Sequence, residues 1–129
     1  MKVSMKEIEN VSKLKPFERY RYFIKKVADF EEVWTIKDQN DDFALSDIEE
    51  YTLVSLWSAE EFIQSNLNEG WKDCVPIKMD LEMLQNELYY VLVKNNYLVN
   101  VFPVNGRSGF VVSIEEFIRD LNLELEDYE

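Results

Sequence analysis

The chain of 129 residues contains no histidine and only one cysteine, Cys74. These absences exclude histidine-based nucleophile pairs, zinc sites with histidine ligands and disulfides within the chain. The three glycines fit neither the dinucleotide-binding nor the P-loop spacing. No apolar run approaches the roughly 20 residues that a membrane-spanning helix needs, and the first ten residues lack the apolar centre of a signal peptide. We therefore expect a soluble cytoplasmic protein without a cofactor or a metal ion.

Apolar residues, in contrast, are plentiful. The hydrophobic fraction is 47%, and the chain holds 3 Trp, 7 Tyr and 8 Phe against only 3 Pro. This composition is typical of a folded protein rather than of a disordered or fibrous one, and the length suits one core. We expect a single domain over residues 1–129, in which residues 1–15 form an N-terminal helical extension and residues 16–129 form the core.

The charge is strongly negative and unevenly distributed. The formal net charge is −12, with 14 basic and 26 acidic residues. Residues 1–30 hold 8 Lys or Arg and 4 Asp or Glu, a net +4, so residues 31–129 hold 6 and 22, a net −16. A surface of this sign repels phosphate backbones and anionic lipids, which predicts neither nucleic acid nor membrane as a partner. Solubility alone explains such a surface, and a basic protein partner is the alternative.

Local patterns predict an alternation of helices and strands. Hydrophobic periodicity of about 3.6 residues favours helices over residues 5–14, 16–30, 81–95 and 114–129, and a further helix that follows Ser58 and ends before Gly70. Runs rich in β-branched and aromatic residues favour strands over 32–37, 43–46, 51–57, 74–79, 97–104 and 109–112. Asp80 is a candidate helix cap. Three pairs have the capping-box spacing: Ser4 with Glu7, Ser58 with Glu61, and Ser113 with Glu116.

The order of these elements predicts an α+β fold. The segments 32–37 and 43–46 resemble a hairpin across the polar turn 38–42, and Asn105-Gly106 marks a second hairpin. Residues 51–57 are apolar on both faces, which predicts a central strand. We expect one mixed, mostly antiparallel sheet of about five to six strands flanked by helices. A more regular α/β layout is the alternative.

Residues 38–49 place oxygen-bearing side chains at the spacing of a calcium loop. Asp38, Asn40 and Asp42 take the first, third and fifth positions, and Ser46 and Glu49 take the ninth and twelfth. The sixth position holds phenylalanine instead of the glycine that the sharp turn requires. A polar hairpin turn therefore explains the segment better than a metal site. Adjacent acidic pairs elsewhere are explained by helix capping and the helix dipole, so no catalytic residue is assigned.

Four residues are candidates for contact with a partner. Trp71 stands in a polar stretch after Gly70, in a region that follows a strand and a helix, where binding loops are common. With Arg107 and the tyrosines at 89 and 90 it suits the edge of a groove. Asp41 and Asp42 belong to the acidic body of the chain. We therefore predict partner contacts at Trp71, Asp41, Asp42 and Arg107.

Several phrases in order are familiar, namely RYFIKKVADFEEVWTIKD, YTLVSLWSAEEF, IKMDLEMLQNEL and YLVNVFPVNGRSGFVVSIEEFIRDL. Over about residues 17–121 the chain resembles a family of uncharacterised bacterial proteins, the domain of unknown function family 2750. The resemblance implies a cytoplasmic bacterial protein of one domain and carries no activity. The chain departs from the family pattern in a leaner turn around residues 38–42 and in its added N-terminal helix.

Three hypotheses of function remain. The first is a non-enzymatic protein-interaction domain, of the accessory or immunity type, acting as a monomer or homodimer. The second is a small-molecule sensor or a carboxylate-based hydrolase, with a pocket beside the central strand. The third is a structural subunit. We favour the first, because the chain lacks the usual catalytic side chains and is strongly acidic.

Overall fold

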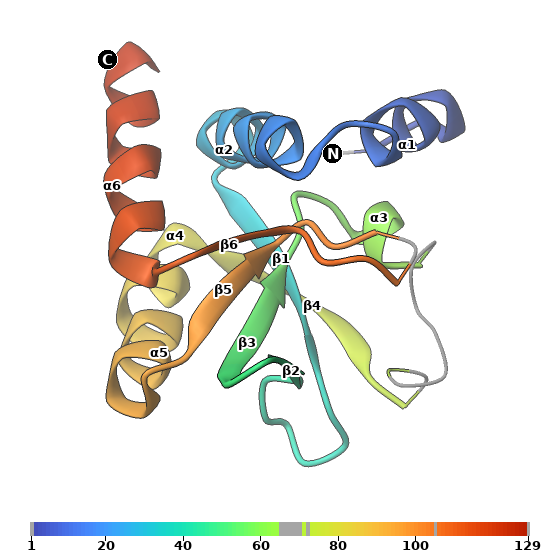
Figure 1. The fold of residues 1–129 in the computed structure, drawn as a ribbon. Helices are drawn as coiled ribbons and strands as arrows, with labels where there is room; N and C mark the ends of the chain where they lie inside the picture. The colour runs from blue at the N-terminus through green and yellow to red at the C-terminus, as the bar shows by residue number, and fades with distance from the viewer. Residues whose placement is uncertain (1, 65–70, 72, 105, 129) are drawn as a thin grey trace.

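The computed structural model describes residues 2–64, 71, 73–104 and 106–128. Its elements in chain order are α1 (Met5–Ser12), α2 (Pro16–Phe30), β1 (Glu32–Lys37), β2 (Leu45–Ile48), β3 (Tyr51–Leu56), α3 (Glu60–Gln64), β4 (Val75–Asp80), α4 (Leu81–Met83), the π-helical turn η2 (Leu84–Leu88), α5 (Tyr89–Asn95), β5 (Leu98–Val101), β6 (Phe110–Val112), α6 (Ile114–Leu125) and the 3-10 turn η3 (Glu126–Tyr128). The expected α+β class is confirmed (Figure 1).

Within the described residues, six strands form two hydrogen-bonded sheets rather than the one sheet expected. Four strands lie in the order β2-β3-β5-β6, and β1 pairs with β4 in a separate antiparallel ribbon. β3 runs parallel to β5, whereas the other pairs are antiparallel. Trp34 and Trp57 join the two sheets, because each backbone N–H donates to the other residue's carbonyl at 2.8 Å. β3 is an internal strand, which confirms its predicted central position.

The hairpin expected between residues 32–37 and 43–46 forms only at its turn. Ala44 N donates to Ile36 O at 3.0 Å, and Lys37 and Phe43 form an isolated antiparallel bridge. From Leu45 onward the chain pairs with β3 instead, as strand β2. β1 pairs with β4 along one edge, and its other edge is bonded to Trp57 at Trp34, so the returning strand pairs with β3 rather than continuing along β1.

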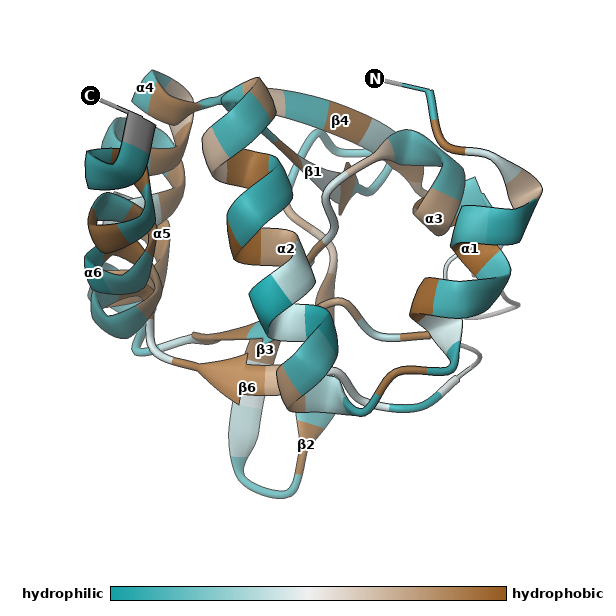
Figure 2. Ribbon diagram, turned by 90° about the horizontal axis from the view of Figure 1, so that it is seen from above, coloured by the Kyte–Doolittle hydropathy of each residue, from teal (hydrophilic) through white to brown (hydrophobic). Residues whose placement is uncertain are grey.

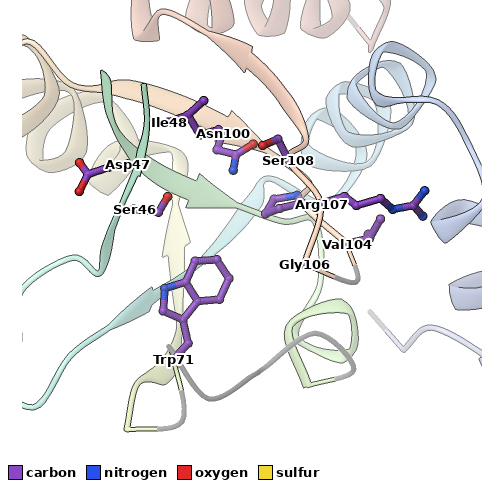
Figure 3. Close-up of a pocket in the computed structure, with 10 residues that line it drawn as sticks. Ser46, Asp47, Ile48, Trp71, Asn100, Val104, Gly106, Arg107 and Ser108 are labelled. Atoms are coloured by element: carbon purple, nitrogen blue, oxygen red, sulfur yellow. The ribbon is translucent and has the colours of Figure 1, made fainter. Parts of the chain in front are cut away.

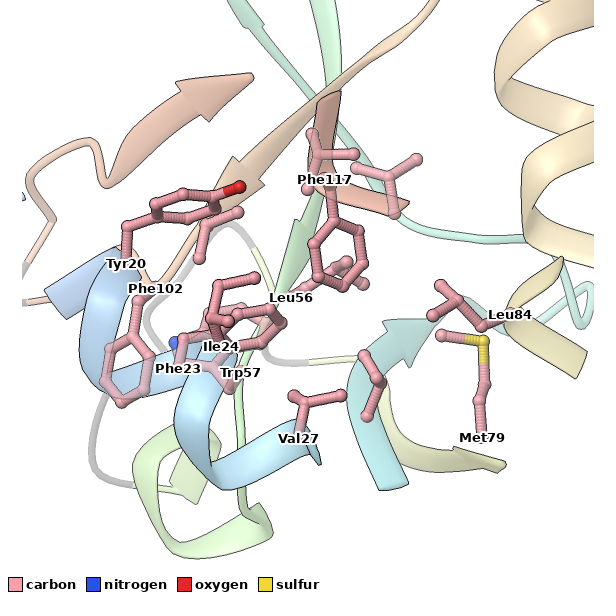
Figure 4. Packing of buried hydrophobic residues seen from close by; sticks show 14 of the residues in the cluster. Tyr20, Phe23, Ile24, Val27, Leu56, Trp57, Met79, Leu84, Phe102 and Phe117 are labelled. Carbon is pink, nitrogen blue, oxygen red and sulfur yellow. The ribbon is translucent and has the colours of Figure 1, made fainter. Parts of the chain in front are cut away.

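Helices cover one face of the four-stranded sheet. The buried stripe of α2, including Phe23, Ile24 and Val27, meets Leu56 of β3 and Phe117 of α6 in the core (Figure 4). Figure 2 shows α2 beside α6, with hydrophilic residues interspersed among the hydrophobic ones on each helix. Among the described residues, no helix is long and apolar enough to cross a membrane.

Three of the four predicted helix caps are confirmed. The side chains of Ser4, Asp80 and Ser113 accept hydrogen bonds from backbone N–H groups in the first turns of α1, α4 and α6. The cap expected at Ser58 is wrong, because its buried Oγ has no hydrogen-bond partner among the described residues. Its expected box partner Glu61 instead accepts a hydrogen bond from Val3 N at 2.9 Å. The rest of this predicted helix, residues 65–69, lies outside the described residues.

The helix predicted over residues 81–95 contains a π-helical turn. Its predicted stripe is buried at Leu84, Leu88 and Leu92, so the apolar periodicity is confirmed. Tyr89 N donates to Leu84 O, five residues earlier, which widens the helix at this turn. The sequence pattern alone does not distinguish such a turn from a regular α-helix.

Candidate functional site

The four predicted contact residues lie in two separate hollows. Trp71 and Arg107 line the first, named here the Trp71 pocket, which has a volume of about 300 Å³. Asp41 and Asp42 line the second, named here the acidic groove, which has a volume of about 520 Å³. The Trp71 pocket is lined by Ser46, Asp47, Ile48, Trp71, Asn100, Pro103, Val104, Gly106, Arg107 and Ser108. The acidic groove is lined by Lys37, Asp38, Asp41, Asp42, Phe43, Leu45, Glu87, Val91, Asn95 and Tyr97.

The fold therefore divides the four predicted contact residues between two hollows. Tyr89 and Tyr90, expected to edge a groove with Trp71, are exposed on α5 and are absent from the lining of both hollows. The strand β2 lies between the two hollows, since it contributes to each of them.

One wall of the Trp71 pocket is the β5–β6 connection, and a buried arginine holds this connection in place. Arg19 of α2 is 3% exposed. Its guanidinium donates to Phe102 O at 3.0 Å, to Ser108 O at 3.3 Å and to Leu14 O. Burial lowers the pKa of Arg19, and the nearby charge of Arg107 lowers it further. The guanidinium thus ties both ends of the connection to the start of α2.

Further hydrogen bonds and one close backbone approach fix the same connection. Trp57 Nε1 donates to Pro103 O at 2.9 Å, and Gly109 N donates to Asn100 Oδ1 at 2.8 Å. A Cβ atom added at Gly109 would lie 1.9 Å from Val101 O, so only glycine allows this approach. The wall of the pocket is therefore set by several independent contacts.

Phe102 adopts a left-handed backbone conformation that is rare for a bulky residue. Its φ is 64°, and such a residue is expected to store strain of order 1–3 kcal/mol. Its N–H donates to Leu56 O at 2.8 Å, and its buried ring packs against Phe62 with centroids 4.6 Å apart. The surrounding core holds the strained residue, which turns the chain out of β5 and toward the pocket.

Trp71 forms the opposite wall. Its ring meets the buried ring of Trp57 edge to face, with centroids 5.9 Å apart and an interplanar angle of 89°. In Figure 3 the Trp71 ring lies across the pocket from Ser46 and Asn100. Trp57 therefore supports both walls, since it holds Trp71 by ring packing and Pro103 by a hydrogen bond.

The polar side chains that point into this pocket are uncharged. Ser46 and Asn100 face Trp71 in Figure 3, whereas the carboxylate of Asp47 and the guanidinium of Arg107 point away from it. Asp47 Oδ1 accepts a hydrogen bond from Thr52 Oγ1 at 2.9 Å. The predicted contact residue Arg107 thus lines the pocket without directing its charge into the interior.

The acidic groove holds a lysine between two acidic side chains. Lys37 Nζ lies 3.7 Å from both Asp41 Oδ1 and Glu87 Oε1, and 5.0 Å from the centroid of the Phe43 ring. The Lys37 side chain is 12% exposed, whereas that of Asp41 is 87% exposed. Glu87 belongs to the π-helical turn η2, which brings it to this groove.

The calcium-loop pattern is resolved as a turn followed by a strand. Asp38 Oδ1 accepts hydrogen bonds from Asn40 N and Asp42 N, at 2.9 and 3.2 Å. Ser46 then lies in β2, and the left-handed conformations fall at Asp41 and Glu49 rather than at the sixth loop position. No group of three or more potential metal-ligating side chains occurs within the described part of the chain.

The basic N-terminal region and the acidic C-terminal helix meet in a third hollow of about 430 Å³ between α2 and α6. Arg21 and Lys25 line one side, and Glu124 and Asp127 line the other. Basic side chains of α2 thus lie across this hollow from acidic side chains of α6 and η3.

Cys74 has the properties of an unreactive thiol. Burial raises the pKa of Cys74, and the carboxylates of Asp38 and Asp73 raise it further. The thiolate is the nucleophilic form, so a raised pKa reduces its population at neutral pH.

The sequence interpretation missed Asn100, Ser46 and Ser108 as pocket residues. Asn100 gave one usable signal, because it is an amide within the otherwise apolar run YLVNVF and a buried polar side chain requires a partner. The two serines gave none, since serine is common in strands and loops without any role in binding.

A family model described as "Protein of unknown function (DUF2750)" matches residues 20–121 of the chain. This range leaves out α1 and contains every residue that lines the Trp71 pocket and the acidic groove. No curated protein matches the chain.

Proposed function

The chain belongs to the DUF2750 family of proteins of unknown function, and we propose that it is a non-enzymatic protein-interaction domain, of the accessory or immunity type, that binds a basic partner through the acidic groove. The observation that carries the proposal is the position of Lys37, whose ammonium group is already held between carboxylates in this groove.

The charge distribution favours a basic partner. Residues 1–30 carry a net +4, and their helices α1 and α2 lie at the opposite end of the molecule from the β1–β2 connection (Figure 1). That connection contributes Asp38, Asp41 and Asp42 to the groove. A surface with this separation of charge steers a positively charged partner toward its acidic end.

The groove also offers apolar area. Leu45 is 45% exposed, and Phe43 and Tyr97 line the groove beside it. An acidic rim around exposed apolar side chains suits a segment that carries both basic and apolar residues, because the aliphatic stems of lysine and arginine cover apolar surface while their charged ends reach carboxylates.

The contacts of Lys37 support a basic side chain as the group that binds in the groove. Its two ion pairs are long and involve exposed carboxylates, so each contributes less than about 1 kcal/mol. A guanidinium from a partner makes two parallel hydrogen bonds to one carboxylate and therefore competes well for Asp41.

The proposal also assigns the protein to the bacterial cytoplasm. The single unpaired cysteine, Cys74, supports this assignment, because a lone free thiol is common in a reducing compartment. The alternative of a hydrolase gains no support from the Trp71 pocket, since the carboxylate that lines it, Asp47, points away from the interior (Figure 3).

Site-specific photocrosslinking in native cells tests the proposal. A photoreactive residue at Leu45 should yield one discrete crosslinked protein with a basic binding segment, and the same residue at Tyr90 on α5 should not. The double variant Asp41→Asn/Asp42→Asn should weaken the purified complex about fivefold or more, since two exposed charge contacts are removed.

A matched control separates this site from the overall charge. Glu126→Gln/Asp127→Asn changes the net charge equally and lies near the C-terminus, outside the groove, so it should leave the affinity within about twofold. Equal weakening by both double variants, or no discrete crosslink at Leu45 at low and physiological salt, would contradict the proposal.

A further inference from the structure

The Trp71 pocket combines a preset shape with uncharged hydrogen-bonding groups. Its β5–β6 wall is fixed by Arg19 and Trp57, and its other wall is the Trp71 ring packed on Trp57. Binding to a preset pocket avoids the entropy loss of ordering the walls. The volume of about 300 Å³ is at the lower end of the range for small-molecule sites and fits one small ring rather than a dinucleotide.

Three polar side chains occur side by side on one face of the four-stranded sheet, and two of them, Ser46 and Asn100, line the pocket. Ser55 pairs with Asn100 in the parallel register of β3 and β5, so their side chains share a face. Ser46 pairs with Leu53, two residues before Ser55, and therefore lies on the same face. This face of the sheet thus carries two hydroxyls and an amide at or beside the pocket.

The side chains of Ser55 and Asn100 use only part of their hydrogen-bonding capacity. Ser55 is 2% exposed, and its Oγ has no hydrogen-bond partner among the described residues. Asn100 is 4% exposed and uses its Oδ1 to accept from Gly109 N. A buried polar atom without a partner is uncommon in proteins, and this one lies next to the pocket residue Asn100.

The lining defines the chemistry of a suitable ligand. Asp47 and Arg107 point away from the interior (Figure 3), so a charged ligand would lose its hydration without gaining a counter-charge. Serine hydroxyls and an asparagine amide both donate and accept, which matches a ligand with several hydroxyl groups. The indole of Trp71 offers an apolar surface to the carbon skeleton of such a ligand.

We propose that the Trp71 pocket binds a small neutral polyhydroxylated ring of monosaccharide size. The hydroxyls of the ligand bond to Ser46, Asn100 and the backbone of the β5–β6 connection, and its C–H face lies against Trp71. This site is separate from the acidic groove, and its occupant is a different molecule from the proposed protein partner.

Ligand-observed NMR and titration of tryptophan fluorescence test the proposal on the purified full-length chain. The probes are glucose, galactose, mannose and N-acetylglucosamine, with glucose-6-phosphate and glucuronate as charged counterparts. At least one neutral sugar should bind saturably, and its charged counterpart should bind about tenfold more weakly or not at all.

Two variants locate the binding. Trp71→Ala and Ser46→Ala should each weaken the sugar, the first by about tenfold or more, while near-ultraviolet circular dichroism confirms that both variants are folded. Ser46→Ala keeps the test valid if Trp71→Ala does not fold, because it removes only a single oxygen atom. Tyr90→Ala, on exposed α5, and Asp41→Asn/Asp42→Asn should leave sugar binding unchanged.

The opposing outcomes are equally definite. The proposal is overturned if none of the sugars binds saturably, if charged counterparts bind as well as neutral ones, or if neither pocket variant affects binding. Preferential binding of a free nucleobase, such as adenine, would overturn the ligand class. None of these results bears on the acidic groove, whose test uses crosslinking at Leu45.

Discussion

At the scale of single residues, alanine substitutions at two glycines of the β5–β6 connection distinguish a steric clash from backbone strain. Gly109→Ala should destabilise the protein by about 2–3 kcal/mol or more, because the new Cβ would meet the backbone carbonyl of Val101. Gly106 has a φ of 76° and open space around it, so Gly106→Ala should cost only about 1–2 kcal/mol of strain. Urea denaturation measures both values. Equal losses for the two variants would contradict the close packing at Gly109.

Tyr20 gives a residue-scale prediction for alkaline pH. Burial, and then the hydrogen bond from its hydroxyl to Asp120 at 2.6 Å, raise the pKa of Tyr20 above its ordinary value of 10.0. Above pH 10 the unfolded tyrosine loses its proton while the folded one keeps it. The unfolded state then binds fewer protons, so the free energy of unfolding falls as pH rises.

The variant Tyr20→Phe should reveal directly how Tyr20 makes the free energy of unfolding depend on pH. Below pH 10 it should be less stable than the wild type by about 1–2 kcal/mol, owing to the lost hydrogen bond to a carboxylate. The difference should shrink as pH rises above 10. Urea denaturation from neutral to alkaline pH measures it, and Tyr90→Phe on the exposed face of α5 is the control. A constant difference between wild type and Tyr20→Phe would exclude the pKa shift.

At the scale of elements, two serines with the same sequence signal have different roles. Ser113→Ala should cost about 1 kcal/mol, because Ser113 Oγ accepts from Glu116 N at 3.1 Å and caps α6. Ser58→Ala should change stability by less than about 0.5 kcal/mol or increase it, since Ser58 Oγ has no partner among the described residues. Thermal and urea denaturation of both variants would decide. A loss at Ser58 equal to that at Ser113 would restore the capping interpretation.

The strands illustrate why local patterns leave pairing open. Residues 32–37 and 43–46 carry a hairpin pattern, yet β1 pairs with β4 and β2 pairs with β3. Each strand has two edges, and the choice between partners depends on segments more than 30 residues away, such as β4 (Val75–Asp80). The second hairpin, β5–β6, is confirmed. Its two strands pair because no other strand in the described part of the chain competes for that edge of β5.

At the scale of the whole molecule, the net charge of −12 should limit stability at low ionic strength. Raising sodium chloride from about 20 mM to about 500 mM should increase the thermal midpoint, because salt screens repulsion among the acidic residues. The variant Glu49→Gln/Glu50→Gln, which removes two exposed acidic charges, should show a smaller increase. Differential scanning calorimetry measures both, and a midpoint that falls with salt would show that attractive ion pairs outweigh the repulsion.

The sequence by itself determined the class of the fold and most of its elements. Helices α1, α2 and α6 begin where capping residues or Pro16 precede an apolar stripe, and such signals act over three or four residues. The strands follow from alternation and β-branched composition in the same local way. The net negative charge follows from composition alone. The resemblance that the family match confirms follows from the order of several sequence phrases.

Only the tertiary structure decided which of these elements meet. It joined Trp71 to the β5–β6 connection, separated Asp41 and Asp42 from them, and set Ser55 beside Asn100. It also imposed the left-handed conformation of Phe102 and the π-helical turn at η2, neither of which local preference favours. The physical reason is that a site depends on contacts between distant segments, and those contacts follow from how the whole core packs rather than from any short stretch of chain.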